Sequence, residues 1–337
     1  MNGRVRIEKA FNNEIVDRVP IGFWRHFVTG EEQFMGMEKQ EILDRAYNEH
    51  VAYYKKIKPD MMKIMSEGFF GYPPIMNNPL NNGEDLKKIK SIGKNHPWIK
   101  EQIKHVKRIS DEMKHDTAIF YNIFAPLQVI RIKFDFLDHE YDKFPYLAEN
   151  FPDELFQAGL EIQKDIKYLV EGLFEANAID GIYYCVQNIQ SQKYPKEKYH
   201  EIITPTEIEV LDTANEYNDM NILHVCGYAN YHNDLSFYKN YKAKCYNWAT
   251  HTEKIDLREG KEYFDNHAVL GGFDNNPNTL LDKASKENLI NETINILNNN
   301  DFPGFIMGAD CSLPDNFDDD RLILIKDTII NYYKERE

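Results

Sequence analysis

Two short segments of the chain hold residue types that bind soft metal ions. The first, residues 221–228, is an apolar run that contains His224 and Cys226 near its end. Side chains two positions apart on a β-strand point to the same face, so this imidazole and this thiolate could bind one metal ion together. The second segment, residues 304–311, places Cys311 where an expected strand gives way to a loop.

These three side chains match the donor set of a catalytic zinc site, in which three protein ligands leave one coordination position open. A single free cysteine is more often a small buried hydrophobe than a ligand, so either cysteine alone would indicate packing. Because a His-x-Cys pair and a distant Cys both stand at strand ends, we predict a Zn²⁺ ion bound by His224, Cys226 and Cys311. Cys185 and Cys245 are expected to be packed thiols.

The elements that would position these ligands are eight apolar, β-rich runs. Most of them are separated by segments with helical spacing of apolar residues, such as 43–57 and 155–173. Alternating strands and helices predict parallel strands, and eight such units predict an α/β fold, a single-domain (β/α)₈ TIM barrel over residues 1–337. The expected strands are residues 18–25, 61–66, 117–124, 181–186, 221–225, 243–248, 268–273 and 304–308.

A barrel explains how ligands far apart in the sequence can meet. The C-terminal ends of all barrel strands open on one mouth, so the fifth and eighth strands can direct side chains to the same point. Residues 68–115 interrupt the alternation and are too long for a simple connection, and we expect them to cover the active site. A solvated surface excursion remains an alternative for the middle of this segment.

Composition limits the possible partners and location. The chain has 40 basic and 55 acidic residues, a formal charge of −15, which disfavours nucleic acid and anionic membranes as partners. No apolar run approaches the roughly 20 residues of a membrane span, and the first eight residues contain no apolar signal segment. We therefore predict a cytoplasmic protein whose four cysteines remain thiols.

Several segments together resemble the uroporphyrinogen decarboxylase superfamily. This superfamily also holds the zinc-dependent corrinoid methyltransferases and is related in fold to cobalamin-independent methionine synthase. The resemblance implies a (β/α)₈ barrel, in agreement with the strand count. The matching segments are residues 17–25, 59–64, 125–126, 224–227, 271–274 and 308–311.

The match to the decarboxylases themselves is incomplete. Arg25 corresponds to the first arginine of their carboxylate-binding segment, but Thr29 occupies the place of the second. Glu67 stands where they have a catalytic aspartate, Ile132 where they have a tyrosine, and Ala309 near the place of an expected histidine. These departures argue against decarboxylation.

The methyltransferase branch is similar in its His-x-Cys after the fifth strand and its Cys after the eighth, the places of His224, Cys226 and Cys311. The resemblance implies a zinc-dependent enzyme that moves a methyl group between a small methylated donor, such as a methyl ether, and cobalamin. No Asp-x-His-x-x-Gly segment is present, so a partner corrinoid protein should supply the cobalamin. A mouth rich in aromatic residues and short of paired arginines favours O-demethylation over methyl transfer to an anionic thiol.

Three alternatives remain open: a methylcobalamin:thiol (coenzyme M-like) methyltransferase, a uroporphyrinogen decarboxylase, and a non-enzymatic platform for a corrinoid protein. Glu67 could protonate a leaving oxygen or be a solvated loop carboxylate. Asp310 could orient His224 or cap a helix. Candidate substrate contacts at strand ends, each of which could instead be packing, are Trp24, Arg25, His26, Tyr183, Tyr184, Gln187, Asn247, Trp248 and Asp274.

Overall fold

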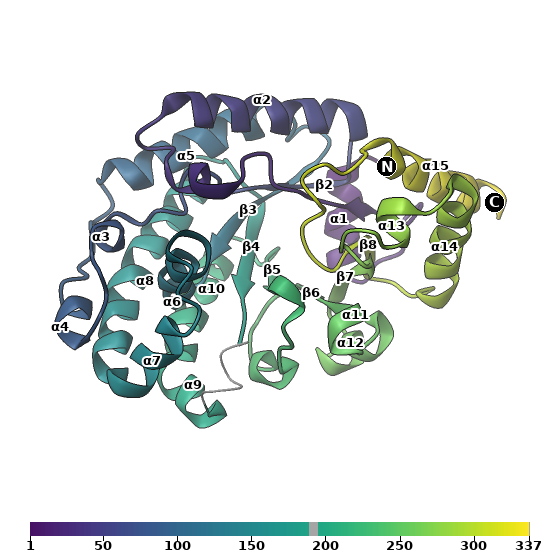
Figure 1. The fold of residues 1–337 in the computed structure, drawn as a ribbon. Coiled ribbons are helices and arrows are strands. Elements are labelled where there is room, and N and C mark those ends of the chain that lie inside the picture. The colour runs from purple at the N-terminus through teal and green to yellow at the C-terminus, as the bar shows by residue number, and fades with distance from the viewer. Residues whose placement is uncertain (189–194, 337) are drawn as a thin grey trace.

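Eight parallel strands form the centre of the molecule, in a computed structural model that describes residues 1–188 and 195–336 (Figure 1). Their order is β1-β8-β7-β6-β5-β4-β3-β2, a nearly closed ring. The predicted single-domain (β/α)₈ barrel is therefore confirmed. The strands are β1 Ile21–Gly22, β2 Met61–Ile64, β3 Ala118–Phe124, β4 Gly181–Val186, β5 Ile222–Val225, β6 Cys245–Trp248, β7 Ala268–Phe273 and β8 Phe305–Ala309.

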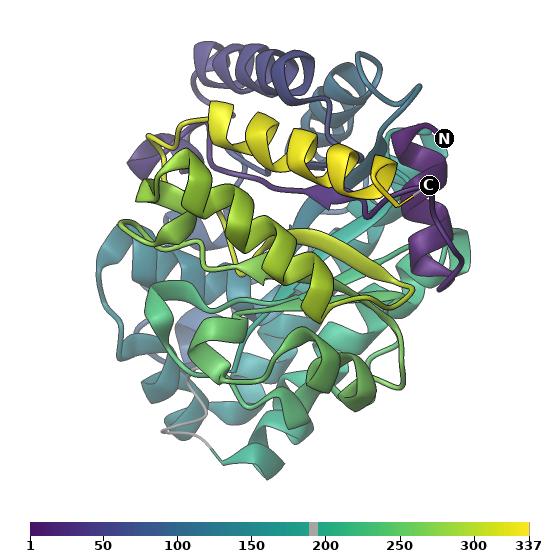
Figure 2. The same cartoon turned by 90° about the vertical axis from the view of Figure 1, so that its right-hand side faces the viewer.

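The longer helices cover the outside of the ring and follow the strands in sequence (Figures 1 and 2). The two predicted helical stripes lie within α2 and α8, and Figure 2 shows α14 and α15 side by side. The covering helices are α2 Gln40–Ile57, α5 Pro97–Ser110, α8 Pro152–Glu175, α10 Thr204–Tyr217, α12 Leu257–Tyr263, α14 Lys286–Asn299 and α15 Asp320–Lys334. The other helices after α2 are α3 Pro73–Met76, α4 Gly83–Leu86, α6 Pro126–Ile132, α7 Lys143–Asn150, α9 Lys196–Ile202, α11 Thr250–Glu253 and α13 Leu280–Lys283.

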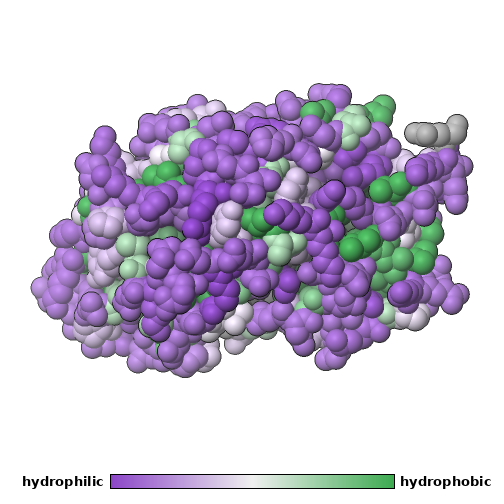
Figure 3. All heavy atoms as spheres, turned by 90° about the horizontal axis from the view of Figure 1, so that it is seen from above, coloured by the Kyte–Doolittle hydropathy of each residue, from purple (hydrophilic) through white to green (hydrophobic). Residues whose placement is uncertain are grey.

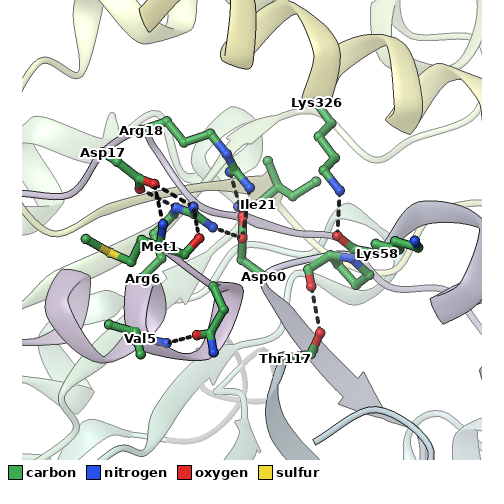
Figure 4. Close-up of polar contacts among 12 residues, drawn as sticks. Met1, Val5, Arg6, Asp17, Arg18, Ile21, Lys58, Asp60, Thr117 and Lys326 are labelled. Carbon is green, nitrogen blue, oxygen red and sulfur yellow. Dashed lines mark hydrogen bonds and ion pairs between the residues drawn. The ribbon is translucent and has the colours of Figure 1, made fainter. Parts of the chain in front are cut away.

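The seam between β1 and β2 is held by a buried carboxylate (Figure 4). The backbone N–H of Asp60 donates to the carbonyl of Ile21 at 3.2 Å, and the N–H of Ile21 donates to Asp60 Oδ2 at 2.9 Å. The same carboxylate accepts hydrogen bonds from Arg6 and Arg18. A side chain thus takes the place of a strand partner on this side of β1. On the other side, β1 pairs with β8 over two residues and is shorter than the predicted run 18–25.

The interior of the ring changes from apolar to polar along its axis. At the N-terminal end, α1 (Gly3–Phe11) packs Ile7 and Phe11 against inward side chains of the strands, among them Phe120. Alternate residues of a strand point inward, so Phe120 is followed on the same face of β3 by Asn122. The polar inward side chains nearer the C-terminal end are Lys63, Asn122, Cys185, His224 and Asn247.

Residues 68–115 form α3, α4 and α5 instead of one long loop. Tyr72 donates a hydrogen bond from its hydroxyl to Asp165 of α8 at 2.6 Å, and α5 lies between α2 and α8. Most of this segment therefore belongs to the outer helical layer.

The outer surface agrees with the acidic, polar composition. The face seen from above in the orientation of Figure 1 is mainly hydrophilic, with scattered hydrophobic residues (Figure 3). Within the described ranges, no helix combines the length and the apolar character that a membrane crossing requires.

Candidate metal centre and cavity

The C-terminal ends of β5 and β8 bring His224, Cys226 and Cys311 together. Cys311 Sγ lies 3.9 Å from Cys226 Sγ and 3.6 Å from His224 Nε2, and one ligand atom of each residue lies within 4.8 Å of the others. His224 is buried, whereas both cysteines are half-buried. The three side chains predicted from the sequence thus form a group that could hold a metal ion.

Backbone hydrogen bonds hold the two strand ends that bear these ligands. The N–H of Cys226 donates to the carbonyl of Val186 at 2.8 Å, which continues the pairing of β5 with β4 past the last residue of the strand. The N–H of Asp310 donates to the carbonyl of Phe273 at 2.9 Å and extends β8 along β7 in the same way. Cys226 therefore continues the pairing of β5, and Cys311 follows the paired residue Asp310.

Asn247 on β6 orients the imidazole of His224. Its Nδ2 donates to the carbonyls of Leu270 at 2.8 Å and Ala309 at 3.2 Å, so its Oδ1 must face the other way. That oxygen accepts a hydrogen bond from His224 Nδ1 and one from the Tyr183 hydroxyl. With the hydrogen on Nδ1, Nε2 presents its lone pair to the two sulfur atoms.

Asp310, although adjacent to Cys311, does not contact His224. Its carboxylate accepts from the Thr250 hydroxyl at 2.8 Å and from the backbone N–H of His251 at 2.9 Å. The predicted orienting role therefore falls to Asn247, which the sequence had indicated as a substrate contact. The strand ends at Ala309, and the alternation of side chains no longer determines where Asp310 points.

The electrostatic setting separates Cys311 from Cys185 and Cys245. The hydrogen bond with Cys226, and then the nearby His224 and Lys63, lower the pKa of the Cys311 thiol well below its usual value, although burial opposes this. Burial raises the pKa of Cys185 to about 11, and it also raises the pKa of Cys245. Cys311 is thus inclined to be a thiolate, while Cys185 and Cys245 are thiols, as predicted for packed residues.

A cavity of about 310 Å³ opens beside the three ligands. One wall is apolar and includes Phe70 and Phe124, whose rings meet edge to face at 5.0 Å. Within the described part of residues 68–115, Phe70 is the one residue that lines this cavity. The polar side of the cavity includes His26, Lys63, Asn122, Gln128 and Gln187.

The predicted substrate contacts divide into two groups. His26 and Gln187 line the cavity, and Trp24 lies beneath it with its ring 5.0 Å from that of Tyr183 and 6.0 Å from that of His224. The others do not line it, because they hold neighbouring elements: Arg25 pairs with Asp319, Tyr184 donates to the carbonyl of Glu207, Trp248 donates to the carbonyl of Ile255, and Asp274 accepts from Asn276.

Glu67 is fully buried and is not a solvated loop carboxylate. Its Oε1 accepts from the backbone N–H of Phe27 at 2.6 Å and lies 3.2 Å from His26 Nδ1. Glu67 itself does not line the cavity, but His26 does. Its visible role is to position that imidazole.

Lys63 is a cavity residue that the sequence analysis missed. It occupies an inward position of β2 between Met61 and Met65, and it is 3% exposed. The available signal was a charged residue inside an apolar strand, since a buried lysine is rare unless it has a specific partner.

Comparison with known proteins agrees with this fold and with the predicted superfamily. A family model described as Uroporphyrinogen decarboxylase (URO-D) matches residues 64–329. A methyltransferase from Methanosarcina mazei is similar in structure, with a TM-score of 0.71, 15% sequence identity and coverage of 99% of each chain. A B12-independent methionine synthase from Shewanella sp. W3-18-1, in complex with selenomethionine, has a TM-score of 0.56 and 11% identity over 94% of this chain and 97% of that one. No curated protein sequence matches.

At such low identities, the two structures show a shared fold and nothing finer. The family model, in contrast, spans most of the barrel, from the end of β2 into α15. The chain belongs to the uroporphyrinogen decarboxylase (URO-D) family.

Proposed function

We propose that this chain is a zinc-dependent methyltransferase that moves a methyl group between a small methylated donor and the cobalamin of a separate corrinoid protein. The observation that supports this most directly is the convergence of His224, Cys226 and Cys311 on one cavity at the barrel mouth. Membership of the URO-D family and the likeness in fold to a methyltransferase agree with the proposal.

The spacing of the donor atoms supports zinc as the metal. Tetrahedral bonds of about 2.3 Å to sulfur and about 2.0–2.1 Å to nitrogen place two sulfurs about 3.8 Å apart and a sulfur about 3.6 Å from a nitrogen. The corresponding distances here are 3.9 Å and 3.6 Å. Three protein ligands leave the fourth position to a ligand in the cavity, as in catalytic sites.

Replacing Asn247 with leucine should weaken zinc binding without abolishing it. The change removes the acceptor that holds His224 Nδ1, and loss of such a partner typically lowers metal affinity about 10–100-fold. Competition with a chromophoric chelator measures the dissociation constant. Asn122→Leu is the matched control, since Asn122 is a buried asparagine of the same cavity that contacts Ser66 and Cys185 instead of a ligand. Equal losses in both variants would show that Asn247 has no special role.

When bound, zinc supplies a Lewis acid that eases the breaking or making of the bond to the methyl carbon. In demethylation of a methyl ether, the carbon–oxygen bond breaks and the leaving oxygen takes up a proton. We assign proton delivery to His26, because it lines the cavity and Glu67 engages its Nδ1, which leaves Nε2 available. Glu67 then acts as a positioning residue.

The cavity also favours methyl transfer over decarboxylation of a porphyrinogen. Porphyrinogen carboxylates require several cationic partners, but among the described residues Lys63 is the only lysine or arginine that lines the cavity. Arg25, the residue that matches the decarboxylase arginine, is engaged by Asp319 and the carbonyl of Asp315. The apolar lining with Phe70 and Phe124 suits a small donor with an apolar body.

The proposal is tested by mixing the chain with its corrinoid protein in the cob(I)alamin state and recording the visible spectrum while aryl methyl ethers, methanol or methylamines are added. We expect methylcobalamin to appear with one donor class and not in a mixture that lacks the chain. Incubation with uroporphyrinogen should yield no coproporphyrinogen.

Two other results would change the assignment. If no donor yields methylcobalamin, and a thiol demethylates methylcobalamin in the presence of the chain, the assigned direction of methyl transfer is reversed. If methyl transfer continues unaltered after removal of zinc, the barrel serves only as a docking platform for the corrinoid protein.

A further inference from the structure

Lys63 places a buried positive charge in the cavity. Its Nζ lies 4.0 Å from the centre of the Tyr183 ring, 4.9 Å from that of Trp24 and 3.9 Å from Cys185 Sγ. The residue is 3% exposed and borders the cavity from the inner face of β2. Two aromatic faces and a thiol thus surround the ammonium group.

This ammonium has no carboxylate partner within ion-pair distance in the part of the chain that the structure describes. Lys133, by comparison, is also buried but is paired with Asp138. Attraction to aromatic faces offsets only part of the hydration that a buried cation loses. Asp315 also borders the cavity, but it is exposed, so solvent screens its charge. The positive charge of Lys63 is therefore uncompensated within the cavity.

The charges of the neighbouring metal group do not remove this excess. Thiolates of Cys226 and Cys311 would carry two negative charges, which cancel those of one divalent ion, while neutral His224 adds none. Lys63 then leaves the site with a net charge of plus one. A ligand with one negative charge would neutralise the site, whereas a neutral ligand would not.

The apolar lining of the cavity indicates what the rest of such a ligand looks like. Phe70 and Phe124 form an edge-to-face pair, and Ile132 packs with them. Flat aromatic groups bind well against such surfaces because ring edges and faces attract each other.

We propose, building on the methyl transfer assigned above, that Lys63 is a specificity-determining residue: it selects a substrate that bears one carboxylate on an apolar body of about one aromatic ring. The carboxylate meets Lys63 Nζ, and the ring lies against Phe70 and Phe124. A methoxylated aromatic acid belongs to this chemical class.

The test measures binding of two probes of equal shape, 4-fluorobenzoate and 4-fluorobenzamide, to the zinc-loaded protein by fluorine NMR. Wild type should bind the carboxylate at least about tenfold more tightly than the amide. In Lys63→Met, this preference should fall below about twofold, because the cation is lost while the side-chain volume is nearly kept. Zinc content, measured on the same samples, should not change.

Lys104→Met is the matched control. The Lys104 side chain is 76% exposed, so this substitution removes the same charge, but from the surface instead of the cavity. It should keep the carboxylate preference. If Lys63→Met does not fold, Lys63→Gln replaces it. Equal binding of both probes by wild type, or no binding of either, overturns the proposal. A preference for the carboxylate probe that persists in Lys63→Met also overturns the proposal, because the metal would then be the group that selects the carboxylate. The binding assay needs no corrinoid protein. Its result can therefore be interpreted even if the methyl-transfer experiment fails.

Discussion

Replacing Cys311 with alanine should leave a folded barrel that no longer retains zinc. Wild type should carry about one zinc per chain, whereas the variant loses one of three protein ligands. The loss of affinity should exceed the roughly 10–100-fold expected when only a supporting partner such as Asn247 is removed. Elemental analysis after dialysis against a weak chelator measures the zinc content, and circular dichroism verifies the fold.

Cys185→Ala is the matched control for this experiment. Cys185 is a thiol that borders the same cavity, but it contacts Lys63 and Asn122 and is not part of the ligand group. The control should therefore keep its zinc. The assignment fails if both variants lose zinc equally, or if carefully reconstituted wild type contains none.

Replacing Asp60 with alanine should strongly lower the stability of the barrel. Asp60 lies just before β2, at the N-terminal end of the strand. The carboxylate is 2% exposed and accepts hydrogen bonds from Arg6, Arg18 and the backbone of Ile21 (Figure 4). Removing one partner of a buried ion pair typically costs about 3–5 kcal/mol when the remaining charge is left unpaired. Here Arg18 loses its carboxylate partner, whereas Arg6 keeps its pairing with Asp17. For a chain of this length, a cost of that size corresponds to a fall in Tm of roughly 4–7 °C.

Asp44→Asn serves as the comparison, because Asp44 pairs with Arg108 at the surface, where its side chain is 52% exposed. Such exposed pairs contribute little to stability, so the change in Tm should be small. Scanning calorimetry of both metal-free variants measures the difference. If Asp60→Ala unfolds no earlier than Asp44→Asn, the carboxylate does not hold the β1–β2 seam.

Local sequence patterns were sufficient to predict the barrel and the three side chains that could hold a metal ion. Apolar runs of strand length, separated by helical stripes, determine the element order, and eight such units leave few arrangements other than a closed ring. His224 and Cys226 share a face because the pairing of β5 with β4 continues to Cys226 and the strand period is two. Cys311 joins them because parallel strands direct their C-terminal ends to one mouth.

The partners of these ligands depended on tertiary structure. Asn247 and Asp310 both stand at strand ends, but only the packed barrel shows that Asn247 reaches His224 and that Asp310 turns to Thr250 and His251. The period of a strand determines side-chain direction only while the strand lasts, and Asp310 lies just beyond β8.

The same physical limit applies to the cavity. Lys63 and Glu67 are close in sequence, yet the first borders the cavity while the second is buried behind His26. The strand period turns Lys63 inward, but what each side chain meets is decided by residues far along the chain, such as Tyr183 for Lys63 and Phe27 for Glu67. Residue types and spacing by themselves thus determined the fold and the group of three side chains that could hold a metal ion. The closure of the ring decided which charged side chains border the cavity, because that depends on distances between strands that no local pattern contains.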